Sequence, residues 1–275
     1  MASFPVALTI AGSDCCGGAG LQADLKTFSA HGVHGLTAVT SVVAETPRAV
    51  QGIYPLSPAA LQEQLRILLE AYPVAAIKTG MLGSAPHVVA VAEILASHNV
   101  PLVVDPVMVS SSGTPLLAAE GVAAYRETLL PLATVITPNL PEAGILQGGK
   151  GPPTARALAE LFGCAVLLTG GHAADEQSAR DILWHEGAAT EFSGEWIEIS
   201  SSHGTGCTLS AALTANLALG KPLLAAVEGA KAFVTRALRE SYAWIQSGRE
   251  IRALNQLPAV FFDPEEESEE LRAAR

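Results

Sequence analysis

The segment HGTGCTLSAAL, residues 203–213, places a cysteine where a glycine-containing turn runs into a helix. Gly204 and Gly206 leave bare N–H groups at the first turn, and leucines four residues apart predict one apolar face on the helix that follows. Such a helix start binds anions through its unpaired donors and the positive end of the helix dipole. The same position lowers the pKa of a thiol, so we expect Cys207 to favour the thiolate; a small thiol that only packs the helix end is the alternative.

Residues with side-chain oxygens that could bind a metal ion follow two of the predicted strands. Asp105 closes the apolar run PLVVD and precedes a proline, while Asn139 and Glu142 stand three residues apart at the start of a predicted helix. Carboxylate and amide oxygens suit a hydrated Mg²⁺ ion or the surroundings of a phosphate. Local structure explains the same residues, because Asp105 can hold a turn and Asn139 with Glu142 can form a capping box. Spacing alone leaves both interpretations open.

Further candidates lie near the first three predicted strands. Residues 11–20, AGSDCCGGAG, form a glycine-rich turn that includes Gly12 and could bring backbone N–H groups to a ligand. This turn matches neither GxGxxG nor GxxxxGK[ST], so a plain tight turn is the alternative. Asp24, one turn into the next helix, and Glu45, just past the second strand, are each a ligand contact or a solvated charge. Lys78 interrupts an apolar strand, which indicates a paired charge.

Short apolar runs alternate with longer amphipathic stretches, which predicts an α/β fold with a mostly parallel sheet and helices on both faces. The predicted strands are 6–11, 37–44, 75–79, 101–105, 134–137 and 165–169, and the predicted helices are 20–30, 58–71, 86–97, 120–130, 154–162, 206–219 and 222–244. Short glycine-separated runs at 181–185, 190–193 and 196–199 predict an antiparallel ribbon. Ligands of open α/β sheets bind beyond the carboxyl ends of the strands, where the candidate residues lie.

Bulk properties restrict the class of protein. The chain has 275 residues, 49% of them hydrophobic and 16% charged, which predicts one compact domain over 1–262 and a flexible acidic tail at 263–275. A net charge of −11 without a basic cluster argues against nucleic acid and membrane partners. No signal-peptide pattern and no apolar run of about 18 residues occur, so we expect a cytoplasmic protein. The four cysteines lack zinc-site spacing, and we expect Cys15 and Cys16 to be reduced thiols.

Several segments occur in one order along the chain: GSDCCGGAGLQADLKTF, KTGMLG, DPVMVSSSG, TPNLPEA, GGH and HGTGCTLSAAL. With them the sequence resembles the hydroxymethylpyrimidine/phosphomethylpyrimidine kinases of thiamin biosynthesis, members of the ribokinase superfamily, over about residues 6–238. The resemblance implies a ribokinase-like fold and ATP- and Mg²⁺-dependent phosphorylation of 4-amino-5-hydroxymethyl-2-methylpyrimidine and then of its monophosphate. The expected partner is this small molecule, and we expect a homodimer.

The resemblance also assigns roles by position. It places Gly204, Thr205, Gly206 and Cys207 in the anion hole, with Cys207 where most ribokinase-like enzymes carry an aspartate base. It places Asn139, Glu142, Thr169, Gly171 and Lys78 near the nucleotide phosphates, Asp105 and Glu142 near Mg²⁺, and Gly12, Asp24, Val42, Glu45 and Met81 around the pyrimidine. His203 is expected to orient the turn. A cysteine that stays neutral would also repel a phosphate monoester less than an aspartate does.

Three departures from the family pattern leave alternatives open. Glu45 stands where the family has a pyrimidine-binding glutamine, so the ring nitrogen or Glu45 must hold a proton for both hydrogen bonds to form, or the ligand must differ. Thr169 replaces a lysine before the GGH glycines, and SGREIRALNQLPA replaces a glycine- and histidine-rich ending. A pyridoxal-type kinase and a ligand-binding homologue without turnover are therefore alternatives. A cysteine hydrolase with His203 as base lacks a visible third group.

Overall fold

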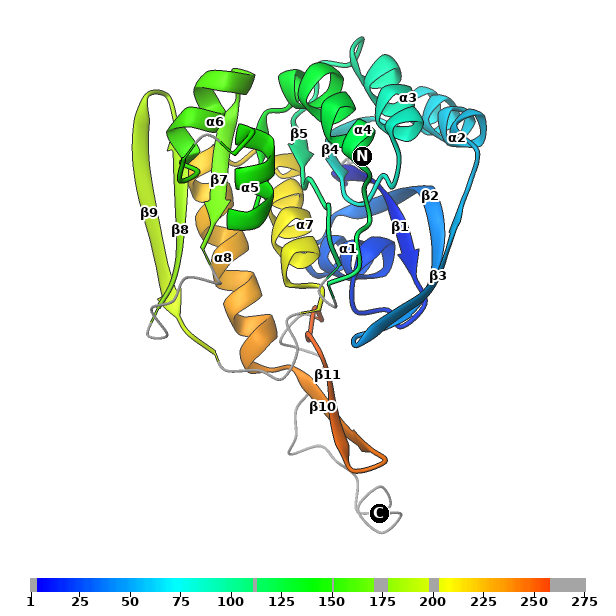
Figure 1. Cartoon of the computed structure of the whole chain (residues 1–275), viewed down its shortest axis with the longest axis vertical. Helices are drawn as coiled ribbons and strands as arrows, with labels where there is room; N and C mark the ends of the chain where they lie inside the picture. Colours follow the sequence, from blue (N-terminus) through cyan, green and yellow to red (C-terminus); the bar gives the residue numbers. More distant parts are fainter. Residues whose placement is uncertain (1–3, 111–112, 150, 171–177, 198–202, 258–275) are drawn as a thin grey trace.

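A computed structural model describes residues 4–110, 113–149, 151–170, 178–197 and 203–257 (Figure 1). These residues form a nine-stranded sheet in the order β3-β2-β1-β4-β5-β6-β7-β8-β9 and a separate two-stranded sheet of β10 and β11. The strands are β1 Val6–Asp14, β2 His34–Thr46, β3 Ala49–Pro55, β4 Val74–Thr79, β5 Leu102–Val104, β6 Val135–Ile136, β7 Ala165–Thr169, β8 Ser178–His185, β9 Ala188–Glu195, β10 Tyr242–Gln246 and β11 Arg249–Ala253.

The middle of the large sheet is parallel, as the sequence predicts. Strands β2, β1, β4, β5, β6 and β7 pair in parallel, and β4 to β7 are short and almost wholly buried. Antiparallel pairs form both edges, with β3 on one side and the ribbon of β8 and β9 on the other. The predicted ribbon is confirmed for its first two runs, while Trp196 lies beyond β9 and 198–199 fall outside the described residues.

Helices cover both faces of the sheet (Figure 1). They are α1 Gly20–Ala30, α2 Pro58–Ala71, α3 Ala85–Leu95, α4 Ala119–Ala124, α5 Leu140–Gln147, α6 Ala155–Phe162, α7 Thr205–Ala218 and α8 Leu223–Arg239. Helices α2 through α6 pack on one face of the sheet through one apolar core. Helices α7 and α8 pack on the other face through a second core, and α1 lies beside α7. None of the described helices is long and apolar enough to cross a membrane.

The helix bounds follow local signals in the sequence. Helices 20–30 and 58–71 appear where predicted, and Ser57 caps α2 by accepting a hydrogen bond from the N–H of Ala60 at 3.2 Å. The predicted helix 120–130 is wrong in detail, because α4 continues as a π turn at Tyr125–Leu129 and a 3₁₀ turn at Leu130–Leu132. Pro131 lacks the N–H that a longer α-helix would use.

The C-terminal elements correct the prediction most strongly. The predicted helix 222–244 ends at Arg239, and β10 and β11 form a hairpin that projects from the body of the protein (Figure 1). Ser247 and Gly248 make its two-residue turn with φ of 52° and 72°, the backbone that a type I′ hairpin turn needs. The strand β3 was also not predicted. The single domain over 1–262 stays a prediction, and the tail 263–275 lies outside the described residues.

Candidate functional site

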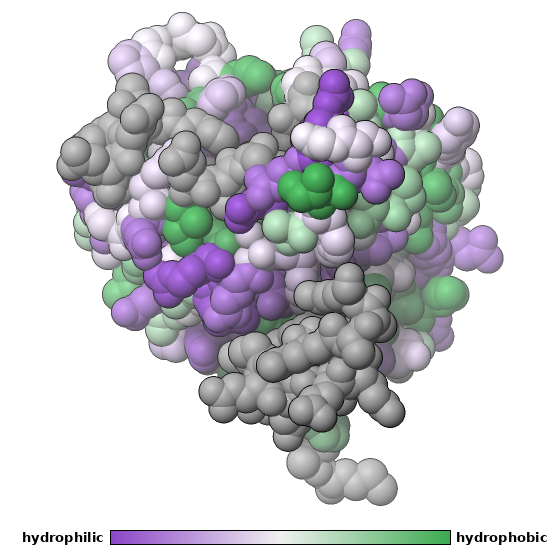
Figure 2. Space-filling model, turned by 90° about the horizontal axis from the view of Figure 1, so that it is seen from below, coloured by the Kyte–Doolittle hydropathy of each residue, from purple (hydrophilic) through white to green (hydrophobic). Residues whose placement is uncertain are grey.

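One large cavity lies at the carboxyl ends of the parallel strands and has a volume of about 1210 Å³. Residues at or just beyond the carboxyl ends of β1, β2, β4, β5, β6 and β7 line it, together with the start of α7, one side of α8 and the β10–β11 hairpin. Figure 2 shows the protein from below, the side from which this hairpin projects, and hydrophilic residues gather across the middle of this face. The cavity thus lies where the topology of an open α/β sheet predicts a ligand.

The turn before α7 is built for close approach. Gly204 is the N-cap of α7 with a φ of 85°, and a Cβ atom there would meet the carbonyl oxygen of Gly18 at 1.9 Å. Gly204 has no side chain to cap the helix, so the first N–H groups of α7 are open to a ligand. Thr205, Gly206 and Cys207 line the cavity beside Gly204. The residues of the predicted anion hole are therefore together and oriented by the helix start.

The thiol of Cys207 differs from the prediction. Its pKa is raised to about 12 because burial disfavours the thiolate, an effect that Lys78 opposes and the carboxylates of Asp105 and Asp24 increase. Burial and these two carboxylates thus favour the neutral thiol, contrary to the expected thiolate. A neutral thiol agrees instead with the expectation that this position repels a phosphate monoester less than an aspartate would.

Asp105 and Glu142 line the cavity next to this turn. Asp105 is 6% exposed and accepts a hydrogen bond from the hydroxyl of Ser210 at 2.9 Å, which ties it to α7. Glu142 forms the capping box of α5, because its Oε2 accepts from the N–H of Asn139 at 3.0 Å and its own N–H donates to Asn139 at 2.9 Å. The capping interpretation of Asn139 and Glu142 is confirmed, and both residues also line the cavity.

This donor set fits a hydrated Mg²⁺ ion. Burial, and then the charge of Asp105, raises the pKa of Glu142 to about 8, and burial likewise raises the pKa of Asp105. Two carboxyl groups that disfavour each other's charge form a site that a divalent cation would neutralise. The hydroxyl of Thr137, buried at the same wall and without a hydrogen-bond partner among the residues that the structure describes, offers another oxygen. Asp105 and Glu142 are thus suited to hold the ion.

An apolar slot lies at the β1–β2 side of the cavity. Met81 packs on Gly12, where an added Cβ atom would lie 2.9 Å from the methyl carbon of Met81 and 3.6 Å from Val43. Gly12, Val43, Glu45 and Met81 all line the cavity. Val42 does not, because successive side chains of a strand point to opposite faces and Val42 is 49% exposed. Val43 therefore takes the position that the prediction gave to Val42.

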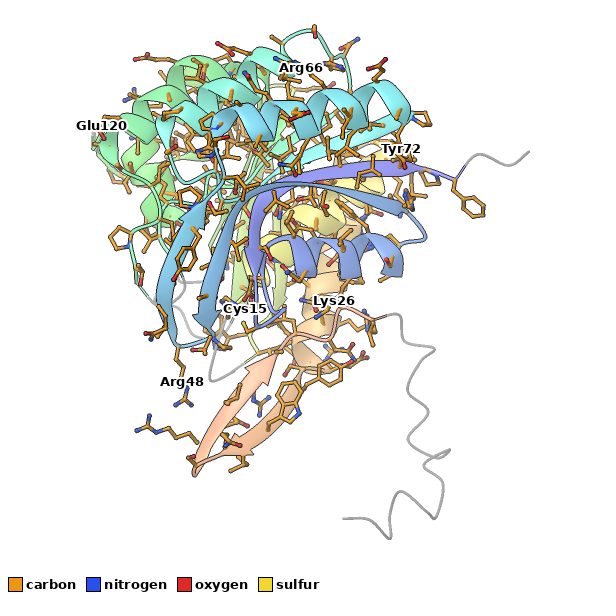
Figure 3. The ribbon with its side chains drawn as sticks, turned by 90° about the vertical axis from the view of Figure 1, so that its right-hand side faces the viewer. Cys15, Lys26, Arg48, Arg66, Tyr72 and Glu120 are labelled. Atoms are coloured by element: carbon orange, nitrogen blue, oxygen red, sulfur yellow. The ribbon has the colours of Figure 1, made fainter. Side chains whose placement is uncertain are left out.

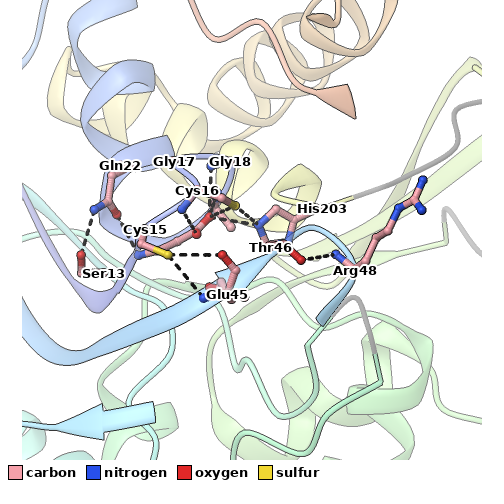
Figure 4. Close-up of polar contacts among 12 residues, drawn as sticks. Ser13, Cys15, Cys16, Gly17, Gly18, Gln22, Glu45, Thr46, Arg48 and His203 are labelled. Carbon is pink, nitrogen blue, oxygen red and sulfur yellow. Dashed lines mark hydrogen bonds and ion pairs between the residues drawn. The ribbon is translucent and has the colours of Figure 1, made fainter. Parts of the chain in front are cut away.

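Glu45 occupies the polar end of this slot. Burial raises the pKa of its carboxyl group, the charge of Asp14 raises it further, and His203 partly opposes the shift. The backbone N–H and carbonyl of Glu45 both contact the thiol of Cys15, at 3.4 and 3.2 Å (Figure 4). The surroundings of Glu45 thus shift its pKa toward the protonated form, which is one of the ways in which both hydrogen bonds of the family glutamine could be kept.

Asp24 and Lys78 are placed differently from the prediction. Neither residue lines the cavity, both are 0% exposed, and the Nζ of Lys78 lies 2.5 Å from Oδ1 of Asp24. Asp24 also accepts from the hydroxyl of Thr9 at 2.6 Å, and Lys78 donates to the carbonyl oxygen of Cys207 at 3.5 Å. Burial lowers the pKa of Lys78, but Asp24, Cys207 and Asp105 raise it overall, so the lysine stays charged beneath the anion hole. This buried pair therefore contacts the backbone of the turn at Cys207 without lining the cavity.

The opposite end of the cavity contains a cation that the sequence did not point to. Thr169 lines this end, and so does Lys231 of α8, whose Nζ lies 2.5 Å from Oδ2 of Asp181 on β8. Lys231, paired with Asp181, therefore places a cation among the residues that line the cavity with Thr169, which sequence spacing could not reveal. Gly171 lies outside the described residues.

Two further contacts lie at the edge of the cavity. His203 lies 3.0 Å from Asp14, which joins the turn before α7 to the end of β1. Burial raises the pKa of Asp14, but hydrogen bonds, that of His203 foremost, lower it overall to about 2. Arg48 of the β2–β3 hairpin donates to the carbonyl oxygen of Glu250 at 2.5 Å, and Figure 3 shows it extended toward the β10–β11 hairpin. Neither contact follows from residue spacing, because each joins elements that are far apart in the sequence.

Comparison with known proteins gives a consistent result. A family model described as phosphomethylpyrimidine kinase matches residues 14–252. The hydroxymethylpyrimidine/phosphomethylpyrimidine kinase of Synechococcus elongatus is 44% identical over 247 residues, which cover 88% of this chain and 94% of that protein.

Solved structures show the same fold. An ADP complex of Bacillus subtilis pyridoxal kinase is similar, with a TM-score of 0.81 and 37% identity, over 92% of this chain and 98% of that one. The phosphomethylpyrimidine kinase of Clostridium difficile has a TM-score of 0.73 and 37% identity, over 85% of this chain and 99% of that one. The ribokinase-like fold is confirmed, and the chain belongs to the phosphomethylpyrimidine kinase family.

Proposed function

We propose that this protein transfers the γ-phosphoryl group of ATP to 4-amino-5-hydroxymethyl-2-methylpyrimidine, and then to the resulting monophosphate. One observation carries the proposal: the apolar slot of Gly12, Val43 and Met81 and the open helix start at Gly204 line the same cavity. A flat heterocycle in the slot would point its hydroxymethyl group toward the anion hole. The ADP bound by the Bacillus subtilis relative supports a nucleotide in the rest of the cavity.

The residues of the cavity would divide the work of transfer. In a loose transition state the charge lies on the oxygens of the migrating phosphoryl group, so catalysis depends on positioning and charge stabilisation. The N–H groups of Thr205, Gly206 and Cys207 would hold those oxygens. Asp105 and Glu142 would hold Mg²⁺, which neutralises phosphate charge when bound.

Cys207 would act late in the reaction. Its raised pKa means that the thiol is neutral when the substrate arrives, and a neutral group does not repel a substrate that already carries a phosphate. Lys78, charged and buried beneath the turn, lowers the cost of a transient thiolate. The hydroxyl proton of the substrate would pass to this sulfur after bond formation to phosphorus is advanced, because a loose transition state needs little nucleophile activation.

A pyridoxal kinase activity is the second candidate. Its support is the pyridoxal kinase fold neighbours and Glu45, whose raised pKa favours the protonated carboxyl group, the form that can both donate and accept a hydrogen bond. Both substrates are flat heterocycles with a hydroxymethyl group, so the slot fits either. A homodimer and a cytoplasmic location stay predictions.

The deciding experiment is ATP consumption by the purified chain with Mg²⁺ and a panel of acceptors. The panel contains the aminopyrimidine, its monophosphate, pyridoxal and a buffer blank. The proposal predicts the highest kcat/KM with the aminopyrimidine and measurable turnover of the monophosphate. Preference for pyridoxal would replace the substrate, and binding of ATP without turnover of any acceptor would contradict the kinase assignment.

A further inference from the structure

Three metal-ligating side chains from two distant parts of the sequence meet at the edge of the cavity. Asp14 is the last residue of β1, Cys16 lies in the loop between β1 and α1, and His203 precedes the turn of α7. Oδ2 of Asp14, Sγ of Cys16 and Nε2 of His203 all lie within 4.8 Å of one another. The proposed kinase reaction gives no role to this thiol.

The spacing of the three atoms matches one small coordination sphere. The separations are 3.0 Å from Asp14 to His203, 3.2 Å from Asp14 to Cys16 and 3.5 Å from Cys16 to His203. Tetrahedral zinc with bonds of about 2.0 to 2.3 Å separates its ligand atoms by about 3.3 to 3.6 Å. An outward movement of about 0.3 Å would therefore make room for the ion, by comparison with that geometry.

The loop is ordered in a way that keeps the ligands together. The carboxylate of Asp14 accepts hydrogen bonds from the N–H groups of Cys16 at 2.8 Å, Gly18 at 3.0 Å and Ala19 at 2.8 Å. Gly18 must lack a side chain, because a Cβ atom there would lie 2.8 Å from Cδ2 of His203. Asp14 and His203 are 2% and 7% exposed, while Cys16 is exposed and offers an entry path.

We propose that Asp14, Cys16 and His203 form a binding site for a soft divalent transition metal of the Zn²⁺ class, separate from the Mg²⁺ position at Asp105 and Glu142. Thiolate and imidazole ligands select such ions, whereas Mg²⁺ takes oxygen ligands. Coordination forms a metal–sulfur bond and breaks the S–H bond of Cys16, whose proton passes to solvent, while His203 binds as the neutral imidazole.

The site has a consequence for the cavity. Asp14 and His203 line the cavity, so the fourth position of a tetrahedral ion is accessible to water or to a ligand bound there. The ion would also join the loop of Asp14 to the residue before Gly204. Metal occupancy would thereby fix the anion-hole turn, and the site would couple a transition metal to ligand binding.

Cobalt(II) titration of the purified, metal-free chain tests the proposal, because a cobalt–thiolate bond gives a near-ultraviolet charge-transfer band. With excess Mg²⁺ present to occupy the position at Asp105 and Glu142, we expect the band to saturate at one cobalt ion per chain, to be lost in Cys16→Ser and to be retained in Cys15→Ser. Cys15 is the matched control, since it is the adjacent exposed thiol and its sulfur contacts Glu45 instead. Loss of one ligand should weaken metal binding by at least about tenfold.

A second measurement uses the unaltered chain and so does not depend on a variant's folding. Zn²⁺ should slow N-ethylmaleimide labelling of Cys16 and leave Cys15 labelling unchanged, as read by peptide mass spectrometry, and a large excess of Mg²⁺ should not reproduce this protection. A cobalt band that survives Cys16→Ser, or equal protection of both thiols, would overturn the proposal. Neither readout requires kinase turnover, so failure of the kinase assignment would leave this test intact.

Discussion

Gly204 lies against the backbone of Gly18, so closely that a Cβ atom on Gly204 would be 1.9 Å from the carbonyl oxygen of Gly18. The contact joins the loop after β1, which leads to the pyrimidine slot, to the turn that begins α7. Because both partners are backbone, neither can move aside as a flexible side chain would. The relative position of slot and anion hole therefore depends on this contact.

Gly204→Ala should damage both folding and turnover. An alanine at a φ of 85° would strain the backbone and push the turn from Gly18, at a cost of about 1 to 3 kcal/mol in the free energy of unfolding. Misplacement of the N–H groups should lower kcat by about a hundredfold. Urea unfolding and steady-state kinetics measure the two effects.

Gly220→Ala provides the matched control for that prediction. Gly220 has a φ of 77° but nothing within 4 Å of an added Cβ atom, and it lies at the far end of α7. It should lose stability through the same strain and keep its kcat. Equal losses of kcat in both variants would argue against the contact.

Lys78→Met should unfold the protein more readily, because it leaves the carboxylate of Asp24 buried without its cation. Breaking one partner of a buried ion pair typically costs about 3 to 5 kcal/mol. Adding Asp24→Leu to Lys78→Met should restore much of the loss, since no charge is then left unpaired. Urea unfolding of the two variants measures this, and a loss below about 1 kcal/mol in Lys78→Met would contradict the pairing.

The sequence could predict the sheet and most helices because local apolar runs and capping residues determine them. The sequence also predicts that Asp105, Glu142 and Cys207 lie at the same edge of the sheet, because the carboxyl ends of parallel strands lie on the same side. The pairing of Asp24 with Lys78 could not be predicted, because it depends on how two elements 54 residues apart pack. The prediction of a low pKa for Cys207 was wrong for a related reason: a helix start can be recognised in the sequence, but the burial of the thiol cannot.

Mg²⁺ binding should become tighter as pH rises. The carboxyl group of Glu142 has a pKa of about 8 and attracts the cation only after it loses its proton. Because this pKa is raised in the folded state, the metal-free protein should lose stability as pH rises from about 4.5 to about 8. Mg²⁺ titration calorimetry from about pH 6 to about pH 9 measures the affinity.

Glu142→Gln is the control for that dependence. Glutamine can keep the capping box of α5 but has no proton to release. The variant should bind Mg²⁺ weakly at every pH, with the slope over this range removed. A slope as steep as that of the unaltered chain would assign the titration to another group.

Glu45→Gln should remove a pH dependence from pyrimidine recognition. Burial and the charge of Asp14 raise the pKa of Glu45, so the protonated form that donates and accepts is lost as pH rises. We expect kcat/KM for the aminopyrimidine to fall with pH in the unaltered chain and to stay level in the variant. Parallel pH profiles for the two proteins would refute a role for this proton.

The most direct test of the central claim is a crystal structure of the chain with Mg²⁺, a non-hydrolysable ATP analogue and the aminopyrimidine. The account predicts the terminal phosphate at hydrogen-bond distance from the N–H groups of Gly206 and Cys207, with the hydroxymethyl group beside it and the ring against Met81. A terminal phosphate bound away from the start of α7 would contradict it.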